Sequence, residues 1–296
     1  MCRKAGKILY LYGQIILLMK ECTGNYFIKN GKMLPVEDFD NKMVYEGESI
    51  YEVLRMVKGF PLFFYDHYKR LVSSILNRKQ TNLSTLNGLL RNIKTLSEIE
   101  KPDEVNLKIV FNYNNPESNY LVYFINASYP SNLQYKEGVK GILFKAERIN
   151  PESKVIHSEL KSAVEERLSA EKAYEALLVN DNNFITEGSR SNIFFIKDKM
   201  LYTAPDNLIL SGITRKHLIN LCNENGIEIR YECVNADKIK DYNSVFMTGT
   251  SPILLPFKNI DNHSFIVESD TVEKLREMFM QKAEQSINNF ILEKFI

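Results

Sequence analysis

An acidic side chain between two apolar strands is the feature of this sequence with the clearest chemical meaning. Residues 185 to 197 read ITEGSRSNIFFIK: an apolar strand ends on Glu187, a turn runs through Gly188 to Arg190, and a second strand leaves from Ser191. A carboxylate among apolar strands costs free energy unless a donor or a cation pairs with it. Two interpretations are open. Glu187 either points to solvent from a hairpin tip, or faces a cationic group that does not belong to the chain.

Two further segments have the composition of an anion site. A helix is predicted to begin at Gly212-Ile213-Thr214, where free backbone N–H groups and the positive end of the helix dipole coincide. Thr248-Gly249-Thr250-Ser251 follows an apolar strand, and the amides of such small residues can surround an anion. Ser and Thr also cap helices and turns routinely, so each segment alone has a purely structural interpretation. Because the chain has no Walker motif and no GxGxxG, the two segments together fit a single phosphate better than a nucleotide.

Two basic residues are candidates for the chemistry at such a site. Arg70 lies one turn after His67 on a predicted helix and could neutralise a phosphate, although a surface Arg is the commoner outcome. Lys154 comes directly before a predicted helix, where it could project from a loop into a cavity, while Lys161 on the same face is expected to be solvated. Serine hydrolysis has little support, because GxSxG is absent and no His has a neighbouring acid that suggests a triad.

The elements that must position these residues divide into two groups. In the first half, strands and helices are segregated, which indicates an α+β domain. Its expected strands are 26–28 and 32–34 around Asn30-Gly31, 50–58, 106–112 and 119–125, with helices from residue 66 and over 84–98. The second half is expected to contain strands 140–145, 176–179, 184–187, 191–196, 200–202 and 244–247, with helices over 155–173, 212–226 and from 271.

Four segments follow from this pattern. Residues 19–130 are predicted to form an N-terminal α/β domain, the turn-rich residues 131–138 a linker, and residues 139–296 a C-terminal domain. Residues 1–18 are basic and then apolar, like the start of a signal peptide. Their apolar run is too short for a membrane span and no small-residue cleavage site follows, so we interpret them as an N-terminal extension of doubtful status.

Composition narrows the class of partner. The chain has 296 residues, of which 44% are hydrophobic and 25% charged, as in an ordinary globular protein. A formal charge of +1 with scattered Lys and Arg gives no case for nucleic acid, so a small molecule is the expected partner. The four Cys residues show no CxxC spacing and the four His residues form no HExxH, which argues against a metal site or disulfide framework and favours the cytoplasm.

The motifs together resemble those of the class IV aminotransferases, the pyridoxal-phosphate enzymes of fold type IV. That family includes branched-chain aminotransferases, D-amino acid aminotransferases and aminodeoxychorismate lyases. The similar segments are YEGESIYEVLR with GFPLFFYDHYKRL, Lys154 with the strand at Glu175, ITEGSRSNIFFIK, NLILSGITR and FMTGTSPILLP. The resemblance runs from about residue 26 to residue 285. It implies a small N-terminal α/β sandwich domain and a larger C-terminal pseudo-barrel α/β domain that binds pyridoxal 5'-phosphate.

The resemblance also assigns roles to individual residues. Lys154 would hold the cofactor as a Schiff base and then move a proton between substrate and cofactor. Glu187 would pair with the pyridine nitrogen; two charges 4 Å apart at a dielectric near 20 interact by roughly 4 kcal/mol. The predicted cofactor-binding residues are Arg70, Glu187, Ser191, Asn192, Leu210, Ile213, Thr214, Gly249 and Thr250, and the predicted substrate-binding residues are Tyr51 and Arg190.

The expected activity is transfer of an amino group between an amino acid and a 2-oxo acid, with β-elimination of the aminodeoxychorismate lyase kind as the alternative. The family completes its site across a subunit interface, which implies a homodimer. Departures from the family pattern leave the amino acid and its chirality open. Branched-chain enzymes have a Tyr where this chain has Glu46, and D-amino acid enzymes have a clamping Arg where we align Asn112. The usual acidic residue of the last motif is Ile253 here.

Overall fold

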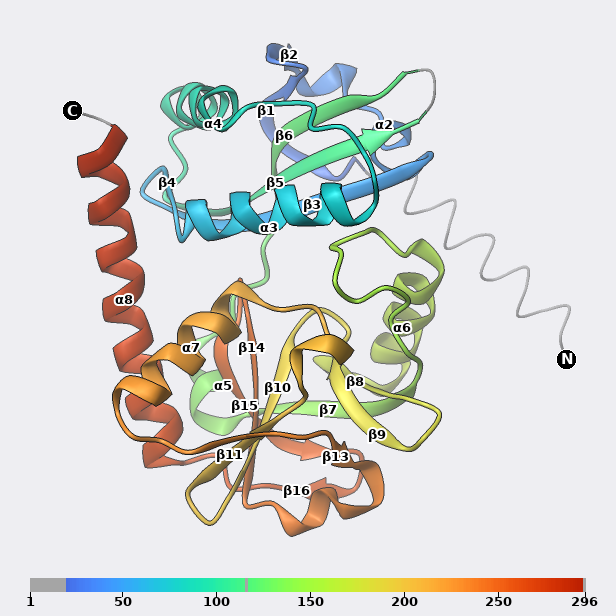
Figure 1. Ribbon diagram of the computed structural model, residues 1–296, viewed down its shortest axis with the longest axis vertical. Coiled ribbons are helices and arrows are strands. Elements are labelled where there is room, and N and C mark those ends of the chain that lie inside the picture. Colours follow the sequence, from blue (N-terminus) through green and yellow to red (C-terminus); the bar gives the residue numbers. More distant parts are fainter. Residues whose placement is uncertain (1–19, 115–116, 295–296) are drawn as a thin grey trace, which may run out of the picture. The chain divides into compact units, whose positions relative to one another are not determined.

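The computed structural model describes residues 20–114 and 117–294, which form two compact units (Figure 1). Unit 1 contains the described residues up to Ala127, with Ser153–Ser162 and the described residues from Ile287. Unit 2 contains Ser128–Glu152 and Ala163–Ser286. The first boundary lies three residues before the predicted end of the N-terminal domain at 130. The predicted extension, residues 1–18, falls outside the described residues.

Unit 1 is built on an antiparallel sheet of six strands. In spatial order they are β2 (Lys32–Pro35), β1 (Cys22–Lys29), β6 (Asn119–Ile125), β5 (Glu104–Tyr113), β3 (Glu48–Val57) and β4 (Phe60–Pro61). The longest pairing joins β3 to β5 from Glu48↔Tyr113 to Val57↔Glu104. Alternate residues of each strand face opposite sides of the sheet, so this register decides which side chains of β3 and β5 share a face.

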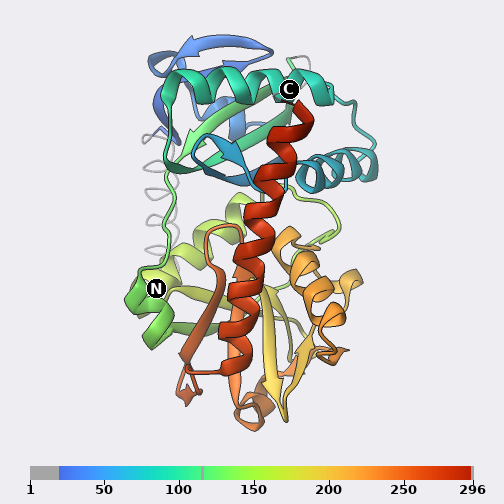
Figure 2. The ribbon, with the colours of Figure 1, turned by 90° about the vertical axis from the view of Figure 1, so that its left-hand side faces the viewer.

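Two helices cover one face of this sheet. Helix α3 (Phe64–Asn77) contacts β3, and α4 (Leu86–Glu100) contacts β1 and β6, as Figures 1 and 2 show. The apolar side of both helices, which includes Leu71, Ile75 and Ile93, packs on the sheet side chains of that face. The other face carries a separate apolar cluster with the short elements η1 (Val36–Asp38) and α2 (Lys42–Tyr45).

Unit 2 is built on a mixed sheet of ten strands. The main path is β12 (Ile229–Tyr231), β11 (Met200–Thr203), β10 (Asn192–Lys197), β14 (Ser244–Gly249), β15 (Ile253–Ile260), β7 (Val139–Lys145), β8 (Glu175–Val179), β9 (Phe184–Gly188) and β13 (Val234–Asn235), and β16 (His263–Ser264) pairs with β15. The pairs β7–β8 and β7–β15 are parallel, while β8–β9 and β10–β14 are antiparallel. Strand β15 was not among the expected elements. From the sequence, residues 248–251 are interpreted as an anion segment, and no strand is assigned to the apolar residues that follow.

The remaining elements are α5 (Asn132–Glu137), α6 (Ser158–Glu171), α7 (Ile213–Glu224), α8 (Asp270–Lys294), η2 (Asp206–Leu208) and η3 (Ala236–Asp241). The segment predicted as a linker contains α5. Ser131 and Gln134 form a capping box there, and their mutual hydrogen bonds stabilise the first turn of a helix. No helix in the described part of the chain has both the length and the hydropathy that a membrane span requires.

Helix α6 begins at Ser158, three residues later than predicted. Val155 and Ile156 are extended instead: Val155 forms a β-bridge with Ile50, and the Ile156 N–H donates to the Ser49 carbonyl at 3.1 Å. β-Branched side chains favour such extended pairing over the first turn of a helix. The apolar periodicity of the sequence predicted the helix, but it could not reveal that Val155 and Ile156 pair with β3 instead.

Candidate functional site

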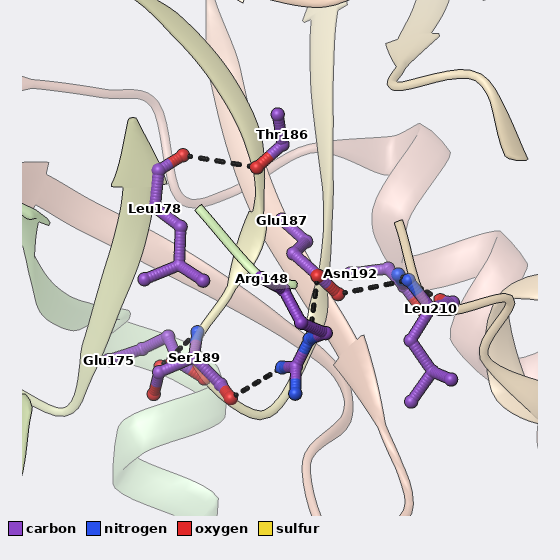
Figure 3. A network of polar contacts seen from close by, with 8 residues as sticks. All are labelled: Arg148, Glu175, Leu178, Thr186, Glu187, Ser189, Asn192 and Leu210. Atoms are coloured by element: carbon purple, nitrogen blue, oxygen red, sulfur yellow. Dashed lines mark hydrogen bonds and ion pairs between the residues drawn. The ribbon is translucent and has the colours of Figure 1, made fainter. Parts of the chain in front are cut away.

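Glu187 is buried near the end of β9, with 2% of its surface exposed. Its Oε1 accepts a hydrogen bond from Arg148 Nε at 2.8 Å, and its Oε2 accepts one from the Leu210 N–H at 3.3 Å (Figure 3). Of the two interpretations of this turn, the solvent-facing hairpin tip is therefore wrong. The buried carboxylate has an ionic partner within the chain, and this partner is Arg148.

A second buried carboxylate shapes the turn that follows Glu187. Glu175, at the start of β8, accepts hydrogen bonds from Ser189 Oγ at 2.6 Å and from Ser191 Oγ at 2.8 Å. Gly188 leaves room for this arrangement, since a Cβ there would lie closer than 3.0 Å to Ser191 Oγ. The hydroxyl of Ser191, a predicted cofactor-binding residue, is thus engaged with Glu175.

Asn192 and Leu210 form a wall next to Glu187. The Asn192 Nδ2 donates to the Leu210 carbonyl at 2.9 Å, and the Leu210 N–H is the group that contacts Glu187. Gly212 follows as the N-cap of α7, and a Cβ on it would lie closer than 3.0 Å to Asn192 Oδ1. The side chain of Asn192 therefore holds the segment that leads into the first turn of α7.

Both predicted anion segments lie near this wall. Ile213 and Thr214 form the first turn of α7, whose leading N–H groups have no intrahelical acceptor. Asn192 on β10 pairs with Thr248 on β14, so the loop containing Gly249 and Thr250 begins beside the same residue. Asn192 thus lies beside both segments: it approaches Gly212 closely, and it pairs with Thr248 at the start of the other segment.

The chemistry of these groups fits pyridoxal 5'-phosphate. Thr248 Oγ1 is buried and has no hydrogen-bond partner within the described residues, which is unusual for a buried hydroxyl. The α7 N-terminus supplies further donors and a positive dipole end for a phosphate. Glu187 would offer a carboxylate to a ring nitrogen, and Leu210, whose N–H contacts Glu187, would offer an apolar side chain. Donors for one end of the cofactor and an acceptor for the other are thus present together in unit 2.

The turn after Gly249 is conformationally strained. Ile253 has a φ of 54° although it is β-branched, and it pairs across the turn with Gly249. A positive φ in a β-branched residue is a genuine outlier, and such strain is often found at binding sites. The Ile253 side chain is buried, with 4% of its surface exposed.

Lys154 is held in unit 1 by backbone contacts to β3 and α3. Its carbonyl accepts from the Tyr51 N–H at 3.0 Å, and its own N–H donates to Ser74 Oγ at 3.2 Å. Its Nζ lies 4.9 Å from the centre of the Tyr51 ring. Lys154 is therefore positioned by strand pairing that precedes α6, and its ammonium group contacts the predicted substrate residue Tyr51.

Arg70 is tied to a carboxylate that sequence reasoning missed. Glu52 on β3 is fully buried and accepts from Arg70 Nε at 2.8 Å and from Arg70 Nη2 at 2.7 Å. The His67 Nδ1 lies 2.7 Å from the same carboxylate. Burial alone would raise the pKa of Glu52, but Arg70 and His67 outweigh it and lower that pKa to about 2. Burial lowers the pKa of His67 below 6.5, although Glu52 opposes this shift. Arg70 is thus fixed by a bidentate ion pair.

A signal for Glu52 was present in the sequence. Strand β3 alternates, and its buried phase reads Ile50, Glu52, Leu54 and Met56. A carboxylate at a buried position of an alternating strand requires a partner. The spacing of His67 and Arg70 on a neighbouring amphipathic helix made these two residues the available candidates.

Lys108 is a second buried charge that the sequence analysis did not single out. It lies on β5, ion-paired to Glu21 at 2.7 Å, and its Nζ is 5.2 Å from the centre of the Tyr51 ring. Burial lowers the pKa of Lys108, and Glu21 only partly offsets this effect. Lys154 and Lys108 therefore both contact the Tyr51 ring.

Two other substrate-side residues are located as follows. Asn112, aligned with the clamping Arg of D-amino acid enzymes, is buried and donates to the Glu46 carbonyl at 2.6 Å and to Ser49 Oγ at 2.9 Å. The Arg190 Nη2 donates to the Tyr174 carbonyl at 2.9 Å, and its guanidinium lies over the Tyr174 ring. The Arg190 guanidinium is therefore engaged with Tyr174.

The family model and the related proteins that match this sequence agree on one family. Residues 49–260 match the model of amino-transferase class IV. The chain is 34% identical over 102 residues to a D-alanine aminotransferase of Bacillus licheniformis, covering 34% of this chain and 36% of that protein. It is 30% identical over 134 residues to a probable branched-chain-amino-acid aminotransferase of Rickettsia conorii, covering 43% and 45%. The chain thus spans less than half the length of these two relatives. A D-alanine aminotransferase of Listeria innocua is matched over 79% of this chain and 84% of its own length at 26% identity.

Solved structures show the same fold. A branched-chain amino acid aminotransferase of Escherichia coli superposes with a TM-score of 0.78 at 19% identity, covering 88% of this chain and 94% of that one. The T.th. branched-chain amino acid aminotransferase with pyridoxamine 5'-phosphate gives 0.78 at 20%, covering 89% and 96%. A putative 4-amino-4-deoxychorismate lyase of Legionella pneumophila gives 0.71 at 23%, covering 80% and 91%. The two-domain α+β architecture implied by the sequence is confirmed.

The family model covers well over half of the chain, and it spans Tyr51, Glu52, Arg70, Lys154, Glu187 and both anion segments. The chain therefore belongs to the class IV aminotransferase family.

Proposed function

We propose that this protein is a pyridoxal 5'-phosphate-dependent aminotransferase that exchanges an amino group between an amino acid and a 2-oxo acid. The observation that carries the proposal is the grouping in unit 2 of a buried, oriented Glu187 with the Asn192–Leu210 wall and the amide-rich start of α7. This combination offers an acceptor for a ring nitrogen and donors for a phosphate, which is what this cofactor requires.

Each residue then has a defined task. Glu187 stabilises positive charge on a ring nitrogen, while the amides of Ile213, Thr214, Gly249 and Thr250 and the guanidinium of Arg70 bind phosphate. Lys154 Nζ is the attachment point and the group that carries a proton to and from the substrate carbon. When bound, pyridoxal phosphate supplies an electron-withdrawing ring that stabilises negative charge at that carbon.

The lysine gives the sharpest test. Lys154→Ala is expected to abolish transamination and the visible absorption band of the purified protein, because the amine that attaches the cofactor is gone. Lys161→Ala, which removes an exposed lysine seven residues later, is the matched control and should retain both properties. A colourless wild-type protein that ignores added pyridoxal phosphate would contradict the proposal.

The amino acid is proposed only as a class. The relatives reported above are named for D-alanine and for branched-chain amino acids, so both L- and D-donors belong in the assay. A panel of L- and D-amino acids with 2-oxoglutarate or pyruvate as acceptor would identify the donor and its chirality. The chain shares its fold with a putative 4-amino-4-deoxychorismate lyase, and elimination remains the second candidate. Release of pyruvate without consumption of a 2-oxo acid would favour that reaction.

We also propose that the active form is a homodimer, on the basis of the family resemblance. A cytoplasmic location stays a prediction from the Cys pattern of the sequence.

A further inference from the structure

Arg148 is a largely buried charged residue of unit 2 that the proposed function does not use. It lies in the loop after β7, and its side chain is only 12% exposed. Its Nε donates to Glu187 Oε1 at 2.8 Å, and its Nη2 donates to the Ser189 carbonyl at 3.0 Å (Figure 3). One guanidinium therefore contacts both the carboxylate and the turn that follows it.

These contacts fix the direction of the carboxylate. Arg148 holds Oε1 of Glu187, and the Leu210 N–H donates to Oε2. Charge-assisted hydrogen bonds from a planar guanidinium restrict both distance and angle. The orientation of Glu187 is thus set by the protein before any ligand binds, which is the condition for electrostatic preorganisation.

The guanidinium also changes the net charge around Glu187, and therefore the attraction of Glu187 for a cationic ligand. A buried carboxylate without a cation is strongly unfavourable, and Arg148 supplies that cation. A second cation bound to the same carboxylate would be repelled by the guanidinium, because like charges a few Å apart disfavour each other. The other charged groups around the turn are engaged elsewhere: Glu175 binds Ser189 and Ser191, and Arg190 lies against Tyr174.

We propose that Arg148 is a positioning residue that directs Glu187 toward the ring nitrogen of the bound cofactor. Its positive charge also makes protonation of this nitrogen less favourable. This inference rests on the proposed function. The sequence gives no local pattern for it, because Arg148 and Glu187 are 39 residues apart and Arg148 lies in a loop.

Thermal unfolding of the full chain with and without pyridoxal phosphate tests the charge balance. Arg148→Gln leaves Glu187 without its guanidinium partner in the cofactor-free protein, and a pyridinium would then replace the missing cation. The gain in Tm on adding cofactor should therefore exceed the wild-type gain by at least about 4 °C. Arg148→Lys keeps a cation and should behave like wild type. Arg167→Gln, which removes an exposed arginine of α6, is the control. A merely structural arginine would lower Tm equally with and without cofactor, and this outcome would overturn the proposal.

The proton on the ring nitrogen can be followed directly. With ring-¹⁵N pyridoxal phosphate bound, the nitrogen's pKa in Arg148→Gln should rise by about 1 unit or more, since a neighbouring cation has been removed. Arg148→Lys should restore most of the wild-type titration. Identical titrations in wild type and Arg148→Gln would disprove the proposal. Failure of wild type itself to bind the cofactor would instead remove the proposed function.

Discussion

At the scale of single residues, the described part of the chain contains three largely buried ion pairs whose partners are far apart in the sequence. They are Glu52 with Arg70, Glu187 with Arg148, and Lys108 with Glu21. In each pair a charge that would be costly alone is compensated by charge-assisted hydrogen bonds. The first two orient residues of the proposed site, and the third places an ammonium group against Tyr51.

Glu52→Gln tests the first pair. Removing this carboxylate leaves Arg70 without its bidentate partner, and we expect the free energy of unfolding to fall by about 3–5 kcal/mol. The control is Glu104→Gln, which removes the 39%-exposed partner of Arg55 on the same sheet and should cost about 0–1 kcal/mol. Denaturant titrations of both variants measure the difference. Equal small losses would show that the Glu52 pair contributes no more than an exposed one.

The same carboxylate predicts an acid dependence. The pKa of Glu52 is about 2 in the folded protein against an ordinary 4.5, so its stabilising effect is complete above pH 4.5. That contribution is lost as the pH falls from 4.5 toward 2. The lowered pKa of His67 acts in the same direction, because the folded state favours the neutral ring and acid protonates the unfolded one first. Unfolding free energies measured against pH should show a shallower acid decline in Glu52→Gln than in wild type.

At the scale of elements, the start of α7 is the feature on which the proposed phosphate binding depends. Gly212 has a φ of −68°, which any residue can adopt, so its role is to leave space beside Asn192. Arg215 in the first turn donates to the Ala204 carbonyl at 2.8 Å and pairs with Asp206, which holds the preceding loop against the helix. The first turn of α7 is therefore held in place by Asn192 next to Gly212 and by the loop that Arg215 binds.

Gly212→Ala should displace Asn192 or the helix start. We expect the Kd for pyridoxal phosphate to rise at least tenfold, about 1.4 kcal/mol, with a smaller effect on stability. Gly226→Ala at the other end of α7 is the control: its added Cβ meets nothing within 4 Å, and its φ of +66° costs about 1 kcal/mol of stability only. Unchanged affinity in Gly212→Ala, measured by fluorescence titration, would contradict this role of the helix start.

At the scale of the whole molecule, the two units contribute different kinds of groups. Unit 1 contains the cations Lys108 and Lys154 beside Tyr51 and Arg70 paired with Glu52, and unit 2 contains the oriented Glu187 and the anion segments. We expect the active protein to run as a dimer of twice 34.4 kDa in light scattering, with activity lost on dilution into monomers. An active protein that stays at 34.4 kDa would contradict the proposed assembly.

The sequence by itself determined the family, the α+β architecture and the segments where chemistry is possible. Glu187 was identified because a carboxylate between apolar strands needs a partner, and the two anion segments because small residues follow a strand or begin a helix. Each of these signals is local, since it depends on the order of neighbouring residues.

Only the tertiary structure decided which groups pair. The register of β3 with β5 places Tyr51 and Lys108 on one face and Glu52 on the other. The β-bridge from Ile50 to Val155 keeps Lys154 out of α6, and the loop after β7 brings Arg148 to Glu187. Such pairings depend on sheet register and side-chain direction across long sequence separations. Local periodicity contains neither, so the proposed orientation of Glu187 by Arg148 could be inferred only from the folded chain.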